Sequence, residues 1–212
     1  LEVSCNVSFG DIGMRLGADA LRAQAEKFGF GQTYLNDLPG QVRSRFPADP
    51  DEPQTALSAI GQYDVAATPL QMAMVVGGIA NGGTVMRPYL VDEVRAPDLS
   101  VLDKARPEAY RSNAVSASVA RQLTTMMVSV VDRGTATPAQ IPGIEVAGKT
   151  GTAQSSPQRP PYAWFVSFAP ADNPQVAVAV LVEDAGVERN AISGSGLAAP
   201  IAKQVMQAVI DR

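Results

Sequence analysis

The sequence predicts an α+β fold in which an antiparallel sheet lies between layers of helices. Stretches with helical spacing of apolar residues recur along the chain before residue 135. Three strand-like segments then follow one another between residues 145 and 183, and one more helical stretch ends the sequence. Helices, then adjacent strands, then a helix is the order expected of a sheet that is covered by helices on both faces.

Composition limits the chemistry that this chain can perform. Its 212 residues suit one domain or a large part of one, and a net charge of −4 gives no basic surface for nucleic acid. The sequence contains no histidine, which excludes Ser-His-Asp and Cys-His mechanisms and zinc sites built on imidazole. Its one cysteine, Cys5, allows neither an internal disulfide nor a Cys-x-x-Cys metal site. A catalytic base would therefore have to be Lys, Asp, Glu or Tyr.

The first quarter of the chain predicts two helices and a loop. Residues 6–16 are weakly helical, and a second helix is expected to begin at an N-cap, Asp19, and to stop at Gly29. Residues 30–55 are rich in Pro, Gly and polar side chains, which favours a long surface loop.

Two further helices are predicted from their capping residues. Thr68-Pro69 begins a helix that is apolar nearly all round, hence buried, and Asn81-Gly82-Gly83 ends it. Residues 85–95 suggest a short hairpin or edge segment, and residues 97–111 a polar loop. Ser116 is expected to cap the next helix, which closes at Asp132-Arg133-Gly134.

Strands are predicted at about 145–154, 162–169 and 175–183. The third is too apolar for a half-exposed strand, so we expect it to be central in the sheet. Turn residues separate the strands, namely Ser155-Ser156-Pro157 and the segment 170–174, and the second connection is short enough for antiparallel neighbours. Residues 193–196 suggest a turn, and Pro200 opens the last helix.

The most unusual segment is Lys149-Thr150-Gly151-Thr152, in which a single cation lies on a predicted strand with little side-chain bulk. On a strand that lines a cleft, Lys149 could bind a carboxylate or shift the pKa of a neighbouring group. The hydroxyls of Thr150 and Thr152 could bind an anionic substrate, Gly151 would let a substrate backbone approach, and the Thr152 N–H could serve an oxyanion hole. The alternative is an exposed strand lysine beside a bulge glycine.

A second motif, Ser4-Cys5-Asn6, lies far upstream. Alone, a serine and an asparagine two residues apart are usually turn or N-cap residues. The two motifs together, with a helical region between them, make the chain resemble the C-terminal part of the transpeptidase domain of class B penicillin-binding proteins. The segments that carry the resemblance occur in the family order; they are Ser4-Cys5-Asn6, Ile60-Gly61-Gln62, Thr68 to Ala73, Ile79 to Gly83, Gly148 to Ala153 and Ala163-Trp164-Phe165.

The resemblance implies a penicillin-binding-protein or β-lactamase-like fold and a serine enzyme that cross-links peptidoglycan stem peptides ending in D-Ala-D-Ala. β-Lactam antibiotics would trap its nucleophile, and no metal or organic cofactor is implied. Ser4 is expected to relay a proton to the leaving group, and Asn6 to hold the substrate backbone and the catalytic lysine. The catalytic-site residue Lys149, together with Thr150 and Thr152, is expected to bind the terminal carboxylate, with the Thr152 N–H as one oxyanion donor. Gly151 is expected to let the substrate lie close alongside the strand.

The chain departs from the family at the first motif, Ser-x-x-Lys, which carries the nucleophile and its base. The residues three positions before the lysines are Gln24, Val101, Val146 and Pro200, so the motif does not occur. Residues 1–212 are therefore expected to be the C-terminal portion of one incomplete transpeptidase domain. The upstream portion, in the same polypeptide or as a separate chain, would supply the serine and further strands. An N-terminal anchor would hold the protein on the extracytoplasmic face of the membrane.

Two other activities fit the same motifs. In a D,D-carboxypeptidase or a β-lactamase, water replaces the acceptor amine, although the sequence suggests no deacylating base for a β-lactamase. From a different class, the chain could belong to a β-lactam-binding sensor or to a scaffold with a vestigial site. The intact Ser4, Asn6 and Lys149 argue against a vestigial site, whereas a sensor would keep them. The segments at Thr68 to Ala73 and Ile79 to Gly83 favour the transpeptidase.

Overall fold

The computed structural model describes residues 1–35, 38–154, 156 and 158–212. Its central sheet has three antiparallel strands in the order β5 (Ala147–Ala153), β6 (Tyr162–Ala169) and β7 (Val176–Val182). The three predicted strands are confirmed. Ser155 and Pro157, from the predicted turn between the first two strands, lie outside the described residues.

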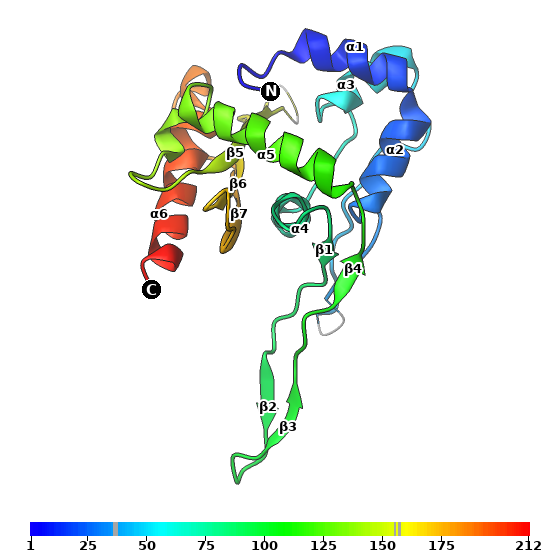
Figure 1. The fold of residues 1–212 in the computed structure, drawn as a ribbon. Coiled ribbons are helices and arrows are strands. Elements are labelled where there is room, and N and C mark those ends of the chain that lie inside the picture. The colour runs from blue at the N-terminus through cyan, green and yellow to red at the C-terminus, as the bar shows by residue number, and fades with distance from the viewer. Residues whose placement is uncertain (36–37, 155, 157) are drawn as a thin grey trace.

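Helices cover both faces of this sheet, as the predicted α+β layering requires. Helix α6 (Ala199–Ile210) lies on one side and α4 (Pro69–Ala80) on the other, as Figure 1 shows. Helix α5 (Ala117–Asp132) packs against β5 and contributes to the apolar clusters of both sides.

The alternation of side chains along β5 and β6 assigns residues to the two faces. Ala147 pairs with Phe168, and both pack with Val76 of α4. Thr150 pairs with Phe165, which packs with Met206 of α6. Odd-numbered residues of β5 therefore face α4, and even-numbered residues face α6.

The prediction that the third strand is central does not hold among the described residues. β6 is the middle strand, and β7 forms an edge of the described sheet, with most of its residues half-buried. The apolar character of β7 is accounted for by helices on both of its faces, since α4 and α6 both contact it. A strand packed between two helical layers is apolar on both sides wherever it stands in the sheet.

Caps define α4 and α5 as predicted. The Thr68 hydroxyl accepts a hydrogen bond from the N–H of Gln71, and the Ser116 hydroxyl accepts one from Val119. Helix α4 ends at its C-cap, Asn81. These caps satisfy backbone N–H groups that have no partner within the first helical turn.

The amino-terminal region contains α1 (Asn6–Leu16), α2 (Ala18–Lys27) and α3 (Glu52–Ala59). The weakly helical segment 6–16 is confirmed as α1. The N-cap of α2 is Gly17 instead of Asp19, which lies in the first turn, where a carboxylate also favours the helix N-terminus. Helix α3 was missed, although Asp51 and Gln54 form a capping box at its start.

The predicted surface loop at residues 30–55 is partly buried and ends early, at α3. Tyr34 and Ser44 are among the buried residues, whereas Asn36 and Asp37 lie outside the described residues. The Tyr34 hydroxyl donates to Oε1 of Gln71, whose Nε2 donates to the Phe28 carbonyl at 2.8 Å. The fully buried Gln71 thus anchors this loop beneath α4.

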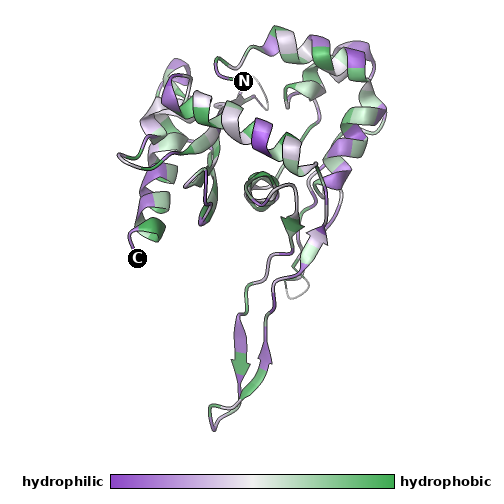
Figure 2. Cartoon of the chain, viewed as in Figure 1, coloured by the Kyte–Doolittle hydropathy of each residue, from purple (hydrophilic) through white to green (hydrophobic). Residues whose placement is uncertain are grey.

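Residues 85–111 form one long arm. β1 (Val85–Met86) pairs with β4 (Ala109–Arg111), and β2 (Glu93–Arg95) pairs with β3 (Val101–Lys104). The prediction of a polar loop at 97–111 was therefore wrong. The arm projects away from the helices (Figure 1), and hydrophilic and hydrophobic residues alternate along it (Figure 2). Residues 93–104 are largely exposed, including the apolar Val94, Val101 and Leu102.

Short helical turns complete the fold: η1 (Thr137–Ala139), η2 (Arg189–Ala191) and η3 (Gly194–Ala198). The predicted turn at 193–196 is instead the start of η3, a π-helical turn that leads into α6. A Cβ on Gly194 would lie 2.1 Å from the Trp164 carbonyl oxygen, so glycine lets this turn pack directly on the sheet. Pro200 lies in the first turn of α6 as expected.

Candidate active site

The two predicted motifs meet in the folded chain. The Lys149 Nζ donates a hydrogen bond of 2.8 Å to the Ser4 Oγ, although 145 positions separate the residues. It donates a second bond of 2.7 Å to the carbonyl oxygen of Thr150. The fold therefore brings a lysine and a serine hydroxyl into direct contact.

Strand geometry explains where Lys149 lies. It shares the α4-facing side of β5 with the buried Ala147, and it is half-buried. Burial lowers the pKa of the Lys149 ammonium below the ordinary lysine value of 10.5. Within the described residues, no carboxylate forms an ion pair with it.

The hydrogen-bond inventory of Lys149 leaves room for an anion. An ammonium group has three N–H donors and no acceptor. Two donors are used, by the Ser4 Oγ and the Thr150 carbonyl. The third N–H and the uncompensated positive charge suit a carboxylate ligand.

Ser4 lies in a constrained segment just before α1. Its φ of 53° is in the left-handed region, which is uncommon for a residue other than glycine. Its N–H bonds to the Leu1 carbonyl at 3.1 Å. Asn6 is the exposed first residue of α1, and its side-chain amide has no hydrogen bond within the described part of the chain. The amide is therefore free to meet a ligand.

The backbone of Thr152 faces away from β6. The Gln62 Nε2 donates to the Thr152 carbonyl at 3.3 Å, just as Lys149 donates to that of Thr150. In an extended strand, the N–H and C=O of one residue point toward the same side. The N–H of Thr152 therefore points to the free edge of β5, as an oxyanion donor must.

Sequence reasoning gave Gln62 no role, although it belongs to the quoted Ile60-Gly61-Gln62 segment. Its side chain links the loop after α3 to the end of β5. The segment itself was therefore a signal that this glutamine has a specific position.

The side chain of Thr150 lies on the opposite face of β5 from Lys149. Its hydroxyl is 2.7 Å from the hydroxyl of Thr135, a residue that sequence reasoning did not single out. Two hydroxyls in contact need only one of their two hydrogens for the bond between them. The other hydrogen remains available, so the expected role of Thr150 in carboxylate binding stays a prediction.

Glycines around Lys149 have packing roles. A Cβ on Gly148 would lie 2.5 Å from the Cζ of Phe165, and one on Gly151 would lie 3.2 Å from the Cβ of Trp164. Gly151 also lies under Gly194, whose added Cβ would be 2.7 Å from the Gly151 carbonyl oxygen. Core packing thus explains both glycines without a ligand, and approach of a substrate along Gly151 is a separate prediction.

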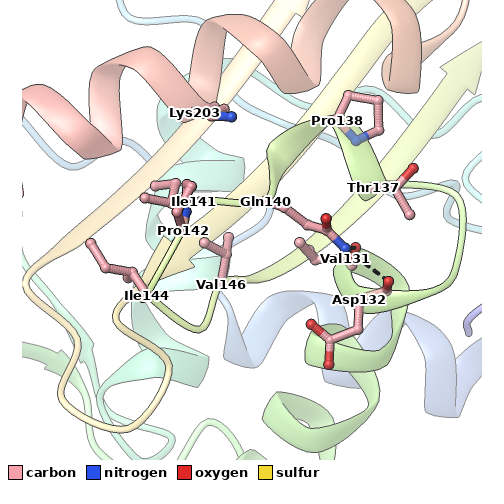
Figure 3. A pocket seen from close by; sticks show the side chains of 10 residues that line it. All are labelled: Val131, Asp132, Thr137, Pro138, Gln140, Ile141, Pro142, Ile144, Val146 and Lys203. Atoms are coloured by element: carbon pink, nitrogen blue, oxygen red, sulfur yellow. Dashed lines mark hydrogen bonds between the residues drawn. The ribbon is translucent and has the colours of Figure 1, made fainter.

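A hollow of about 450 Å³ lies elsewhere, between the end of α5, η1 and α6. Figure 3 shows its lining, which includes Gln140, Val146 and Lys203 but none of the predicted site residues. In the described ranges no group of three His, Cys, Asp or Glu side chains could hold a metal. No helix described there is long and apolar enough to cross a membrane.

Comparison with known protein families identifies the family of this chain. Residues 1–207 match the family described as the penicillin binding protein transpeptidase domain. The chain belongs to the penicillin-binding protein transpeptidase family. This confirms the resemblance that the two motifs suggested.

Relatives within the transpeptidase family share almost the full length of this chain. It is 44% identical to the peptidoglycan D,D-transpeptidase PbpA of Mycolicibacterium smegmatis, over 98% of this chain and 42% of that protein. The PbpA of Mycobacterium tuberculosis gives the same three values. The chain thus spans less than half the length of these relatives.

Solved structures agree with the family assignment. The crystal structure of M. tuberculosis PbpA superposes with a TM-score of 0.88 at 42% identity, covering 97% of this chain and 49% of that one. The ceftriaxone acyl-enzyme complex of the same protein has a TM-score of 0.90, covering 97% and 46%. The fold is therefore that of part of a penicillin-binding protein transpeptidase domain.

Proposed function

We propose that residues 1–212 are the C-terminal part of the catalytic domain of a peptidoglycan D,D-transpeptidase. The observation that carries the proposal is the 2.8 Å contact between Lys149 and Ser4, in a chain without histidine. Relatives named D,D-transpeptidases and a neighbour solved as a β-lactam acyl-enzyme support it.

In the proposed reaction, a serine oxygen attacks the carbonyl carbon of the D-Ala-D-Ala peptide bond. The C–N bond breaks, and the terminal D-Ala leaves as the amine after taking a proton. The amine of a second stem peptide then attacks the acyl ester, forms a new peptide bond and releases the serine oxygen, which recovers a proton. A β-lactam would follow the first half of this sequence and stay attached.

The residues of this chain have proposed roles in those steps. Because the Lys149 Nζ donates to the Ser4 Oγ, the hydroxyl hydrogen of Ser4 is free to be given to the leaving nitrogen. The third Lys149 donor would bind the terminal carboxylate at the free edge of β5, which the hydroxyls of Thr150 and Thr152 would reach from the opposite face of the strand. The Thr152 N–H would stabilise the oxyanion, and the exposed Asn6 amide would hold the substrate backbone.

The nucleophile is proposed to come from outside residues 1–212, since no lysine here lies three positions after a serine. The same upstream portion of the protein is proposed to pair with the free edge of β7. A sheet edge with apolar faces is a favourable template for another strand. We also propose an extracytoplasmic location with an anchor upstream, as the substrate would require.

A fluorescent penicillin and peptide mapping of the full-length protein test this proposal. We expect a covalent adduct on a peptide outside residues 1–212, and none when the protein is first treated with unlabelled benzylpenicillin. An adduct on a serine within residues 1–212, or no adduct at all, would overturn it. Supplying a D-amino acid acceptor together with a donor peptide then separates transpeptidation from hydrolysis by a carboxypeptidase.

A further inference from the structure

The segment Arg133-Gly134-Thr135, which follows α5, contacts both walls of the candidate site. One wall is the stretch Leu1 to Cys5, which carries Ser4, and the other is β5, which carries Lys149. Sequence reasoning treated Arg133 and Gly134 only as the end of a helix and did not single out Thr135. Its contacts show a more specific arrangement.

The first wall is held at Glu2. The backbone N–H of Thr135 donates to the Glu2 carbonyl at 3.2 Å, and the Arg133 Nε donates to the Glu2 carboxylate at 3.0 Å. A bond of 2.8 Å from the Arg133 Nη2 to the Ser129 hydroxyl orients the guanidinium. The side chains of Arg133 and Glu2 are 71% and 37% exposed, so their ion pair adds little stability and serves mainly as a geometric constraint.

Gly134 permits this contact. A Cβ on Gly134 would lie 2.5 Å from the Glu2 carbonyl oxygen and 2.9 Å from the backbone of Val130. Both neighbours are backbone atoms, which cannot move aside by changing rotamer. Any larger residue would therefore push the Ser4 segment outward or displace the end of α5.

The second wall is held by the Thr135 side chain, whose hydroxyl lies 2.7 Å from that of Thr150. Thr135 thus bonds to the Ser4 segment through its backbone and to β5 through its hydroxyl. Two short links through one residue fix the separation of the walls. The contact that this separation controls is the one between the Lys149 Nζ and the Ser4 Oγ.

Ser4 needs such support because its φ of 53° is costly for a serine. Strained backbone conformations persist only where the surroundings determine them. We propose that Arg133, Gly134 and Thr135 are positioning residues that set Ser4 against Lys149. This inference rests on the proposed function, because it assumes that the Ser4–Lys149 contact is used in acylation.

The test uses the full-length protein and a chromogenic β-lactam. The kinetics give two constants: the dissociation constant of the noncovalent β-lactam complex and the rate constant of acylation. Titration with the β-lactam counts the reactive sites, so that each rate refers to folded protein. Thr135→Val removes the hydroxyl and keeps the shape, Thr135→Ser keeps the hydroxyl, and Gly134→Ala adds the clashing Cβ. Thr137→Val is the matched control, since Thr137 is exposed and lies two positions after Thr135, at the start of η1.

We expect Thr135→Val and Gly134→Ala to slow the acylation step roughly ten- to hundredfold per titrated site, as small misplacements of catalytic groups do. Thr135→Ser and Thr137→Val should acylate like the parent. The inference is overturned if Thr135→Val keeps the parental acylation rate constant, or if Thr135→Ser is as slow as Thr135→Val. Failure of the parent itself to acylate would instead contradict the proposed function.

Discussion

At the scale of single residues, the site is organised around one lysine that has no acidic partner among the described residues. Lys149 bonds to a hydroxyl and a carbonyl, both neutral, and is half-buried. A buried cation without an anion is unfavourable in the free protein. That cost is removed when a carboxylate binds, so the arrangement favours an anionic ligand over an empty site.

Replacing Lys149 with Ala should slow acylation by a carboxylate-bearing β-lactam roughly a hundredfold, the size of effect seen when a preorganised donor is removed. The fold should persist, because the Lys149 ammonium is half-buried and forms no ion pair within the described part of the chain. Stopped-flow acylation and thermal unfolding of the full-length protein measure the two effects. Unchanged acylation would contradict the role of Lys149.

The pKa of Lys149 also predicts a pH dependence. Because burial lowers this pKa, the ammonium loses its proton at lower pH than a free lysine, and carboxylate binding should weaken as pH rises through that value. The unfolded state has the higher pKa and binds this proton more tightly. As pH rises through the lowered pKa, the contribution of Lys149 to the free energy of unfolding therefore becomes more favourable to the folded state. Deprotonation of Lys149 therefore cannot unfold the protein, and a fall in the acylation rate over this pH range would report on the site itself.

A Lys149→Arg variant provides the control, since arginine stays charged throughout that range. Its overall acylation rate will differ because the geometry of arginine differs. The decrease in acylation rate at alkaline pH that is attributable to residue 149 should disappear. Parallel alkaline limbs in the two proteins would contradict the assignment.

At the scale of elements, the starts of two helices could be predicted from their capping residues, whereas the buried polar contacts between elements could not. α4 and α5 were found from Thr68 and Ser116, whose hydroxyls accept bonds from the first turn. Gln71, by contrast, was identified only as part of a family segment. The structure shows that it anchors the loop before α3, which no local pattern could reveal because its partners are 37 and 43 positions away.

The cap of α4 gives a stability prediction. Thr68→Ala leaves the N–H of Gln71 without its partner and should lower the free energy of unfolding by about 1 kcal/mol. Thr68→Ser keeps the hydroxyl and should cost less. Urea unfolding of the full-length protein measures both; equal losses in the two variants would show that the methyl group matters instead of the cap.

At the scale of the whole molecule, the arm stands apart from the candidate site. Asp92 and Ala105 face each other across it, joined by a bond of 2.7 Å from the Ala105 N–H to the Asp92 carbonyl. This geometry allows residues 93–104 to be replaced by Asn-Gly, which forms a two-residue hairpin turn.

The shortened protein should acylate at the parental rate, because the removed strands contact chiefly each other. Its thermal unfolding should also change little, since exposed strands bury little apolar surface. Acylation kinetics of the full-length protein with and without the replacement test this. A large loss of acylation would mean that the arm supports the site.

The described sheet is a further feature of the whole molecule. β5 is one edge, where Gln62 and Lys149 bond to outward-facing carbonyls, and β7 is the other. The strong apolar character of β7 predicted a central strand, whereas β7 is an edge of the described sheet. Hydropathy reports how much of a side chain is covered, and helices can cover a strand as well as neighbouring strands do.

The sequence by itself determined the layered α+β class, the three strands, the caps of α4 and α5, and the pair of motifs that meet at Lys149. The layers, strands and caps follow from periodicity and capping chemistry, and the pair of motifs follows from the family resemblance, helped by the absence of histidine. Only the tertiary structure decided the strand order, the arm, the anchoring by Gln71, and the contact of Thr135 with both walls of the site. Those features depend on contacts between residues far apart in the chain, and local patterns carry no information about such distances.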